Sequence, residues 1–196
     1  MFFLTTHRIR KTCVSHLTAC CTGILFFFLF LCKSVFADQA ENDSYELKAA
    51  LLYKLALFIE WPKSAFHGDE HSFGLCVLGK NPFGTSLNVV KKRSINSRKI
   101  NVHIFSKANE AKKNCHLIFL SQSNQPSVKQ ALSVLSHQAI LTVSDIPGFA
   151  EKNGMIEMIT IDDRNGFRIN RRVLQQAGLK AAASLLQLSD IVGDKQ

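Results

Sequence analysis

The sequence FGLCVL at residues 73–78 is a short, continuous apolar run, and the turn sequence NPFG follows at residues 81–84. An apolar run of this length between Gly and Pro predicts a β-strand that is buried on both faces. The turn then predicts a helix that runs towards Val90. A buried strand followed at once by a helix is typical of a parallel sheet.

The same alternation of strand and helix continues along the chain. Strands are predicted at residues 100–105, 117–120 and 139–143, a short polar helix near 108–112, and a helix at 127–135 that Pro126 opens. Elements that alternate at this spacing imply right-handed crossovers. The fold class is therefore α/β, with a largely parallel sheet that has helices on both faces.

Further elements are predicted on either side of this region. Apolar residues at three- and four-residue spacing predict an amphipathic helix from Asp43 or Ser44 until Trp61-Pro62. After residue 155, the segments 155–161 and 167–169 are predicted to pair as a C-terminal β-hairpin, because the Asn165-Gly166 dipeptide lies between them. Helices follow around residues 173–177 and 181–188. Since the linkers are short, residues 38–196 are expected to form one domain.

The first 37 residues have the pattern of a Sec-type signal peptide. Arg8, Arg10 and Lys11 precede an apolar stretch at residues 24–31, and Val35-Phe36-Ala37 is a plausible cleavage site. Cleavage there leaves residues 38–196 as the mature chain. The pattern therefore predicts export to the periplasm.

Two alternatives exist for this segment. An uncleaved membrane anchor would need ~20 apolar residues, and Lys33 ends the apolar run well before that length. The sequence LTAC at residues 17–20 looks like a lipoprotein box and suggests lipidation at Cys20. This box precedes the apolar stretch, however, whereas a lipoprotein box follows it.

Most of the excess positive charge belongs to this segment. The full chain has 24 Lys and Arg against 15 Asp and Glu, a net charge of +9. Residues 1–37 hold four of the basic residues and none of the acidic ones, so the mature chain carries +5. A mildly basic protein gives little support for nucleic-acid binding. The sequence KKRSINSRK at residues 91–99 is interpreted as a solvated loop, with contact to an anionic surface as the alternative.

Four of the six cysteines lie in the first 37 residues, so the mature chain keeps only Cys76 and Cys115. An even pair in an oxidising compartment predicts one disulfide. Cys76 lies in the first predicted strand and Cys115 just before the third, and in such sheets these two strands are commonly neighbours. A structural disulfide is the favoured interpretation, and a redox switch is the alternative.

The sequence has no G-x-S-x-G, H-E-x-x-H, C-x-x-C or Walker A motif, which argues against an enzyme and against a bound cofactor. The segment His67-Gly68-Asp69-Glu70-His71 is interpreted as a solvated loop, with zinc or copper binding as the alternative. The candidate partner contacts are Ile146, Phe149 and Met155 in a glycine-containing loop, together with Trp61. These apolar side chains form either an exposed patch for a partner or part of the core.

Several segments resemble the periplasmic YfiR/HmsC-like family, in the same order along nearly the whole mature chain. They are KAALLYK (48–54), FIEWP (58–62), FGLCVLGKNPFG (73–84), CHLIFL (115–120), LTVSD (141–145), FAEKNGMIEM (149–158), NGFRIN (165–170) and LKAAASLLQLSDIV (179–192).

The resemblance implies a non-enzymatic repressor in the periplasm that binds the periplasmic sensor region of an inner-membrane diguanylate cyclase. Such binding keeps cyclic di-GMP and biofilm formation low, and an OmpA-like outer-membrane lipoprotein releases the cyclase. The resemblance also implies a homodimer and a bridge between Cys76 and Cys115. Some family members have a second cysteine pair in the segment matching residues 146–157, and this chain has none there. The alternative function is a periplasmic small-ligand-binding module with a crevice at the strand ends.

Overall fold

The computed structural model describes residues 44–66, 70–161 and 164–193 of the 196-residue chain. The signal-peptide prediction for residues 1–37 lies outside the described residues. From Tyr45 onward the described residues belong to one compact unit, and this unit is a single α/β domain.

The first described element is the predicted amphipathic helix, which occupies residues 44–58. Ala49, Leu52, Leu55 and Ala56 on its inner face are at most 2% exposed, as their spacing predicts. The short strand β1 (Ile59–Glu60) directly follows the helix and pairs antiparallel with β9 (Lys180–Ala181). This pair was not predicted, because strands of two residues carry no periodicity.

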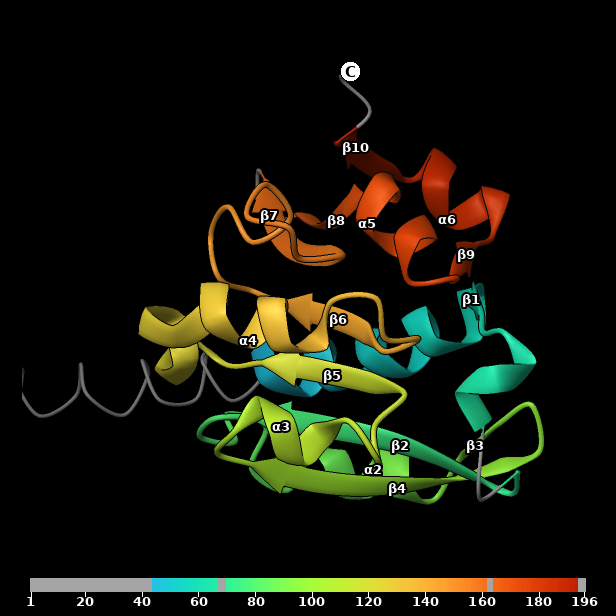
Figure 1. Cartoon of the computed structure of the whole chain (residues 1–196). Coiled ribbons are helices and arrows are strands. Elements are labelled where there is room, and N and C mark those ends of the chain that lie inside the picture. The colour runs from blue at the N-terminus through green and yellow to red at the C-terminus, as the bar shows by residue number, and fades with distance from the viewer. Residues whose placement is uncertain (1–43, 67–69, 162–163, 194–196) are drawn as a thin grey trace, which may run out of the picture. The chain divides into compact units, whose positions relative to one another are not determined.

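The main sheet has eight strands in the order β10-β8-β7-β6-β5-β2-β4-β3 (Figure 1). Their bounds are β2 (Ser72–Leu78), β3 (Ser94–Ile95), β4 (Arg98–Phe105), β5 (Leu117–Leu120), β6 (Leu141–Ser144), β7 (Ile156–Ile161), β8 (Arg164–Asn170) and β10 (Ser189–Val192). The strands β4, β2, β5, β6 and β7 run parallel to one another. This confirms the prediction of a largely parallel sheet.

Helices cover both faces of the sheet. The first helix, α2 (Leu87–Lys91), α5 (Arg171–Gln176) and α6 (Ala183–Gln187) bury side chains in one core cluster, and α3 (Ala108–Ala111) and α4 (Val128–Leu135) in the other. Two 3-10 helices, η1 (Lys63–Phe66) and η2 (Gln122–Ser127), complete the connections. In β2, Phe73, Leu75 and Val77 point into the first cluster and Cys76 and Leu78 into the second.

The C-terminal hairpin forms, but its turn is not at the predicted dipeptide. The β7–β8 register pairs Thr160 with Asn165, Ile159 with Gly166 and Ile161 with Arg164. Asn165 and Gly166 are therefore strand residues, and the connection falls at residues 162 and 163, outside the described residues. The Asn-Gly signal did not locate the turn, because the pairing of β7 with β8 begins at Ile161 and Arg164 and keeps the dipeptide within β8.

The basic run at residues 91–99 contains a second hairpin, which the sequence interpretation treated as a loop. Ser94 and Ile95 form β3 and pair antiparallel with Lys99 and Arg98 at the start of β4. The two turn residues, Asn96 and Ser97, have φ angles of 48° and 68°. Two successive residues with positive φ are the requirement of a type I′ hairpin turn.

Candidate functional site

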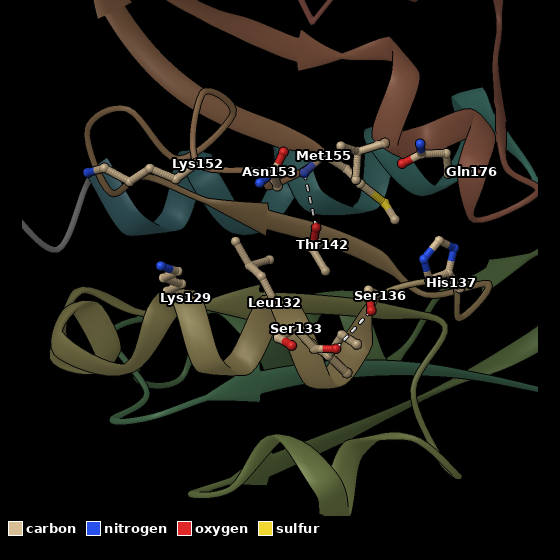
Figure 2. Close-up of a pocket in the computed structure, with 12 residues that line it drawn as sticks. Lys129, Leu132, Ser133, Ser136, His137, Thr142, Lys152, Asn153, Met155 and Gln176 are labelled. Atoms are coloured by element: carbon tan, nitrogen blue, oxygen red, sulfur yellow. Dashed lines mark hydrogen bonds between the residues drawn. The ribbon is translucent and has the colours of Figure 1, made fainter.

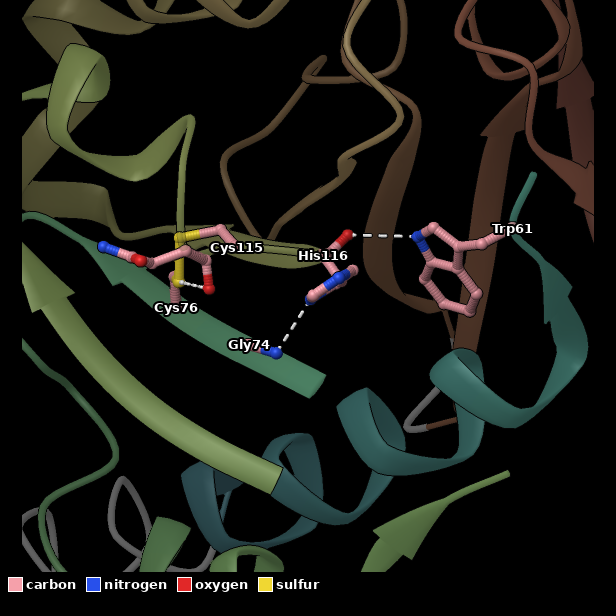
Figure 3. Close-up of a disulfide and its surroundings, with 6 residues drawn as sticks. Trp61, Gly74, Cys76, Cys115 and His116 are labelled. Carbon is pink, nitrogen blue, oxygen red and sulfur yellow. Dashed lines mark hydrogen bonds between the residues drawn. A yellow bond between two sulfur atoms is a disulfide. The ribbon is translucent and has the colours of Figure 1, made fainter. Parts of the chain in front are cut away.

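The predicted disulfide is present on one face of the sheet, between β2 and the segment that leads into β5 (Figure 3). Cys76 on β2 and Cys115 just before β5 have Cα atoms 5.8 Å apart. The two strands are neighbours, as predicted, and Cys76 lies opposite Ile118. The bridge is inside the protein, since Cys76 is 0% and Cys115 6% exposed. It fixes the segment before β5 against the centre of β2.

His116, next to the bridge, connects three elements. Its ring atom Nδ1 accepts a hydrogen bond of 2.9 Å from the backbone N–H of Gly74, and the backbone N–H of His116 donates to the carbonyl of Gly74 at 2.8 Å. Trp61 Nε1 donates to the His116 carbonyl at 3.3 Å, and its ring meets the Phe73 ring edge-on. Figure 3 shows the Trp61 nitrogen pointing at this carbonyl. The side chain of Trp61 is therefore held in place by both a hydrogen bond and ring packing.

Three of the four candidate partner contacts are buried. Ile146 is 1%, Phe149 0% and Met155 2% exposed, so no partner touches these side chains in this conformation. The exposed-patch interpretation of the loop is corrected, and the core interpretation describes all three. The loop closes over the Phe149 ring because residue 154 is a glycine, whose absent Cβ would lie 2.2 Å from that ring.

Trp61 differs from the other three because it is only half-buried. With Leu57, which is 40% exposed, it lines a recess of about 640 Å³ that also includes Phe66, Asn96 and Arg98. An aromatic side chain that is rigidly held and partly exposed is the usual anchor of a protein interface. Of the predicted contacts, Trp61 is therefore the one that a partner can reach.

A buried carboxylate, Glu157, holds the loop that contains Phe149. It is 3% exposed and accepts hydrogen bonds from the backbone N–H groups of Gly148 at 2.9 Å and Ala150 at 3.1 Å. Arg168 lies 3.8 Å from it and also pairs with Glu151 and Asp190. The hydrogen bond to Asp190, followed by the charges of Glu157, Asp190 and Glu151, raises the pKa of Arg168 despite its partial burial. The guanidinium thus stays charged beside Glu157.

Replacing Glu157 by glutamine is expected to lower the free energy of unfolding by about 2 to 3 kcal/mol, because the amide NH₂ would face a buried backbone N–H and the pairing with Arg168 is lost. Glu151→Gln is the matched control. Its side chain is 63% exposed beside the same arginine, at 3.6 Å, so we expect a change within about 0.5 kcal/mol. Urea unfolding of both variants measures the difference, and equal effects would contradict the role of Glu157.

A second buried carboxylate, Asp145, joins the first helix to the sheet. It directly follows β6 and its side chain is 5% exposed. Lys48 Nζ lies 2.6 Å from its Oδ2, and the Tyr45 hydroxyl donates to the same oxygen at 3.1 Å. This cluster was not predicted, although the sequence contains both a carboxylate directly after a buried strand and a lysine on the helix.

A pocket of about 330 Å³ lies between α4, α5 and the loop before β7 (Figure 2). Lys129 and Lys152 lie at one end in Figure 2, and His137 and Gln176 at the other. Leu132 and Met155 contribute apolar surface, and none of the lining residues is acidic. A small anion with an apolar body matches this lining in charge and character.

No group of three or more His, Cys, Asp or Glu side chains in the described part of the chain is arranged to hold a metal ion. His67 and Asp69 of the predicted histidine-containing loop lie outside that part. The described helices include none that is both long and apolar enough to cross a membrane.

Comparison with known proteins identifies the family of this chain. The sequence profile of the YfiR/HmsC-like family matches residues 45–190. No curated protein matches the chain. Among solved structures, the chain is similar to "the ABC domain in complex with L-Trp" from Streptococcus pneumonia, with 10% sequence identity and a TM-score of 0.45. That alignment covers 62% of this chain and only 55% of the other. Because the family profile spans the domain from the first helix into β10, the chain belongs to the YfiR/HmsC-like family, whose members are regulators of the periplasm.

Proposed function

We propose that this protein is a non-enzymatic repressor that binds the periplasmic sensor region of an inner-membrane diguanylate cyclase. Binding would restrain cyclic di-GMP production and biofilm formation. The observation that carries the proposal is the family match over residues 45–190, which spans seven strands of the main sheet and the first half of β10. The proposal includes export through a cleaved signal peptide at residues 1–37.

The recess around Trp61 is the proposed contact for the cyclase. The recess combines the apolar side chains of Leu57, Trp61 and Phe66 with the charged residues Glu60 and Arg98. Protein interfaces have this mixture of apolar and polar surface. Trp61 is fixed by His116 and Phe73, which lowers the entropy lost when a partner packs on it. Leu57 contributes exposed apolar area without belonging to the buried core.

Two further partners belong to the proposal. A homodimer is expected, which light scattering of the mature protein can test by its mass. An OmpA-like outer-membrane lipoprotein is the expected releasing partner, and it would compete with the cyclase for the repressor.

Deletion of the gene is expected to raise cellular cyclic di-GMP several-fold and to increase biofilm, because the cyclase loses its inhibitor. Expression of the wild-type protein from a plasmid should reverse both changes. The measurement is the nucleotide concentration in extracts under conditions where the protein is expressed. Unchanged nucleotide and biofilm under all such conditions would contradict the proposal.

The pocket between α4 and α5 favours a second candidate function, a small-ligand-binding module. Lys129, Lys152 and His137 give the pocket positive or titratable groups, and its lining contains no carboxylate to oppose an anion. A ligand that binds only the folded protein raises its melting temperature. A rise with anionic metabolites that is lost in Lys129→Ala would support this candidate.

A further inference from the structure

The outer edge of β4 is largely open. Strand β4 pairs with β2 from Lys99 to Phe105, but on its other side β3 pairs only with Arg98 and Lys99. Figure 1 shows β4 on the outer border of the main sheet, with β3 near one end of it. From Ile100 to Phe105, no strand of the described chain lies along this side.

Three residues of β4 direct their backbone groups towards the open side. The N–H of Lys99 donates to the carbonyl of His71, and the carbonyl of Phe105 accepts from the N–H of Gly79. The backbone groups of the odd-numbered residues of β4 therefore point towards β2. Backbone groups alternate in direction along a strand, and therefore Ile100, Val102 and Ile104 face outward. Such a row can pair with an added strand of about five residues.

The open edge lies within the most basic part of the chain. Residues 91–113 contain eight Lys and Arg and a single acidic residue, Glu110. The rest of the mature chain has 12 basic and 14 acidic residues. The positive charge of the mature protein is thus concentrated in the segment of the chain that contains β4. The basic residues are Lys91, Lys92, Arg93, Arg98, Lys99, Lys107, Lys112 and Lys113, all exposed except the half-buried Arg98.

We propose that the β4 edge binds an extended, acidic segment of a partner protein by strand addition. The outward backbone groups would supply hydrogen bonds, and the basic residues would attract the segment and discriminate against neutral ones. Ile104, which is 55% exposed, offers an apolar contact for an alternate side chain of the added strand.

Two other occupants fit less well. A second copy of this chain would bring two basic edges together, and lysines on an edge strand normally prevent such pairing. An anionic membrane matches the charge but makes no use of a row of backbone donors and acceptors. The inference rests on the proposed function only in that the protein works by binding another protein.

The experiment titrates the mature protein, at low and at physiological salt, with a short blocked peptide in which Glu and Val alternate. The control peptide alternates Lys and Val. We expect the acidic peptide alone to bind, more weakly at high salt, and to slow amide hydrogen exchange at Val102 and Ile104. Equal binding of both peptides, or binding without protection of these two amides, would overturn the proposal.

Two pairs of variants separate the edge from its surroundings. Ile104→Pro removes an outward N–H without removing a β2–β4 hydrogen bond, and should weaken acidic-peptide binding by about tenfold or more. Ile104→Thr keeps the N–H and should bind nearly as well as the wild type. The double variant Lys99→Glu with Lys107→Glu should weaken binding of the acidic peptide. Its control, Arg172→Glu with Lys180→Glu, makes the same charge change on exposed residues outside the basic segment and should leave binding unchanged.

The remaining outcomes are also decisive. One such outcome is that phosphatidylglycerol vesicles bind more tightly than the acidic peptide and that Ile104→Pro binds the vesicles as well as the wild type does. This outcome would overturn the proposal in favour of a membrane contact. Self-association abolished by Ile104→Pro would overturn it in favour of an interface between copies. The probe is a synthetic peptide, so failure of the strand-addition proposal does not change the expected effect of gene deletion on cyclic di-GMP. The two proposals can therefore fail separately.

Discussion

Replacing Gly74 by alanine is expected to lower the free energy of unfolding by at least about 3 kcal/mol, at or above the upper end of ordinary overpacking effects. A Cβ atom on residue 74 would lie 1.7 Å from the carbonyl oxygen of Asn114 and 2.7 Å from its carbonyl carbon. Both are backbone atoms, and the segment cannot withdraw easily. Cys115 is bridged to Cys76, and His116 exchanges two hydrogen bonds with Gly74 itself.

Gly166→Ala is the matched control, since Gly166 also lies in a strand of the main sheet. Its nearest neighbour is the Ile159 side chain at 3.6 Å, an ordinary contact distance, and its φ is not positive. We expect a change within about 0.5 kcal/mol. Urea unfolding midpoints of both variants give the comparison. If the Gly74→Ala protein were as stable as Gly166→Ala, the backbone of Asn114 would not lie against Gly74 as described.

Removal of the disulfide has the second large expected effect. The bridge closes a loop with a sequence separation of 39, and the chain-entropy account assigns such a loop roughly 4 kcal/mol. We expect Cys76→Ala with Cys115→Ala to lose about 2 to 5 kcal/mol of unfolding free energy. Changing both residues avoids leaving a buried unpaired thiol.

Reductant provides the internal control for this prediction. Dithiothreitol should destabilise the wild type by a similar amount and leave the double variant unchanged, because only the wild type has a bond to reduce. Native protein from the periplasm should contain no free thiol. Titration that finds two reactive cysteines in the native protein would contradict the bridge.

The larger elements of the fold were predictable because their signals are local. The apolar run at residues 73–78 and the helical spacing of residues 44–58 both appear in the structure. The short strands β1, β3, β9 and β10 were missed. Three of them, β1, β9 and β10, depend on pairing between segments that are distant in the sequence, which no local pattern contains. The β3–β4 turn was missed because Asn96-Ser97 is a weaker signal for positive φ than Asn-Gly.

The candidate site was less predictable than the fold. An apolar loop such as residues 146–155 has the same composition whether it faces a partner or the core, and the structure places Phe149 in the core. The roles of Asp145 and Glu157 depend on neighbours from other elements, Lys48 and the backbone at Gly148. The importance of β4 arises only from the strand order, because the sequence does not specify which strand lies at the edge.

The repressor proposal is tested most directly by capturing partners with the tagged mature protein from detergent-solubilised envelopes and identifying them by mass spectrometry. We expect to recover a membrane protein that has a periplasmic sensor and a cytoplasmic GGDEF domain. Leu57→Glu should lose that protein, whereas Leu188→Glu, a change at an 80% exposed leucine outside the recess, should retain it. Recovery of only the protein itself or of a transporter would contradict the repressor account.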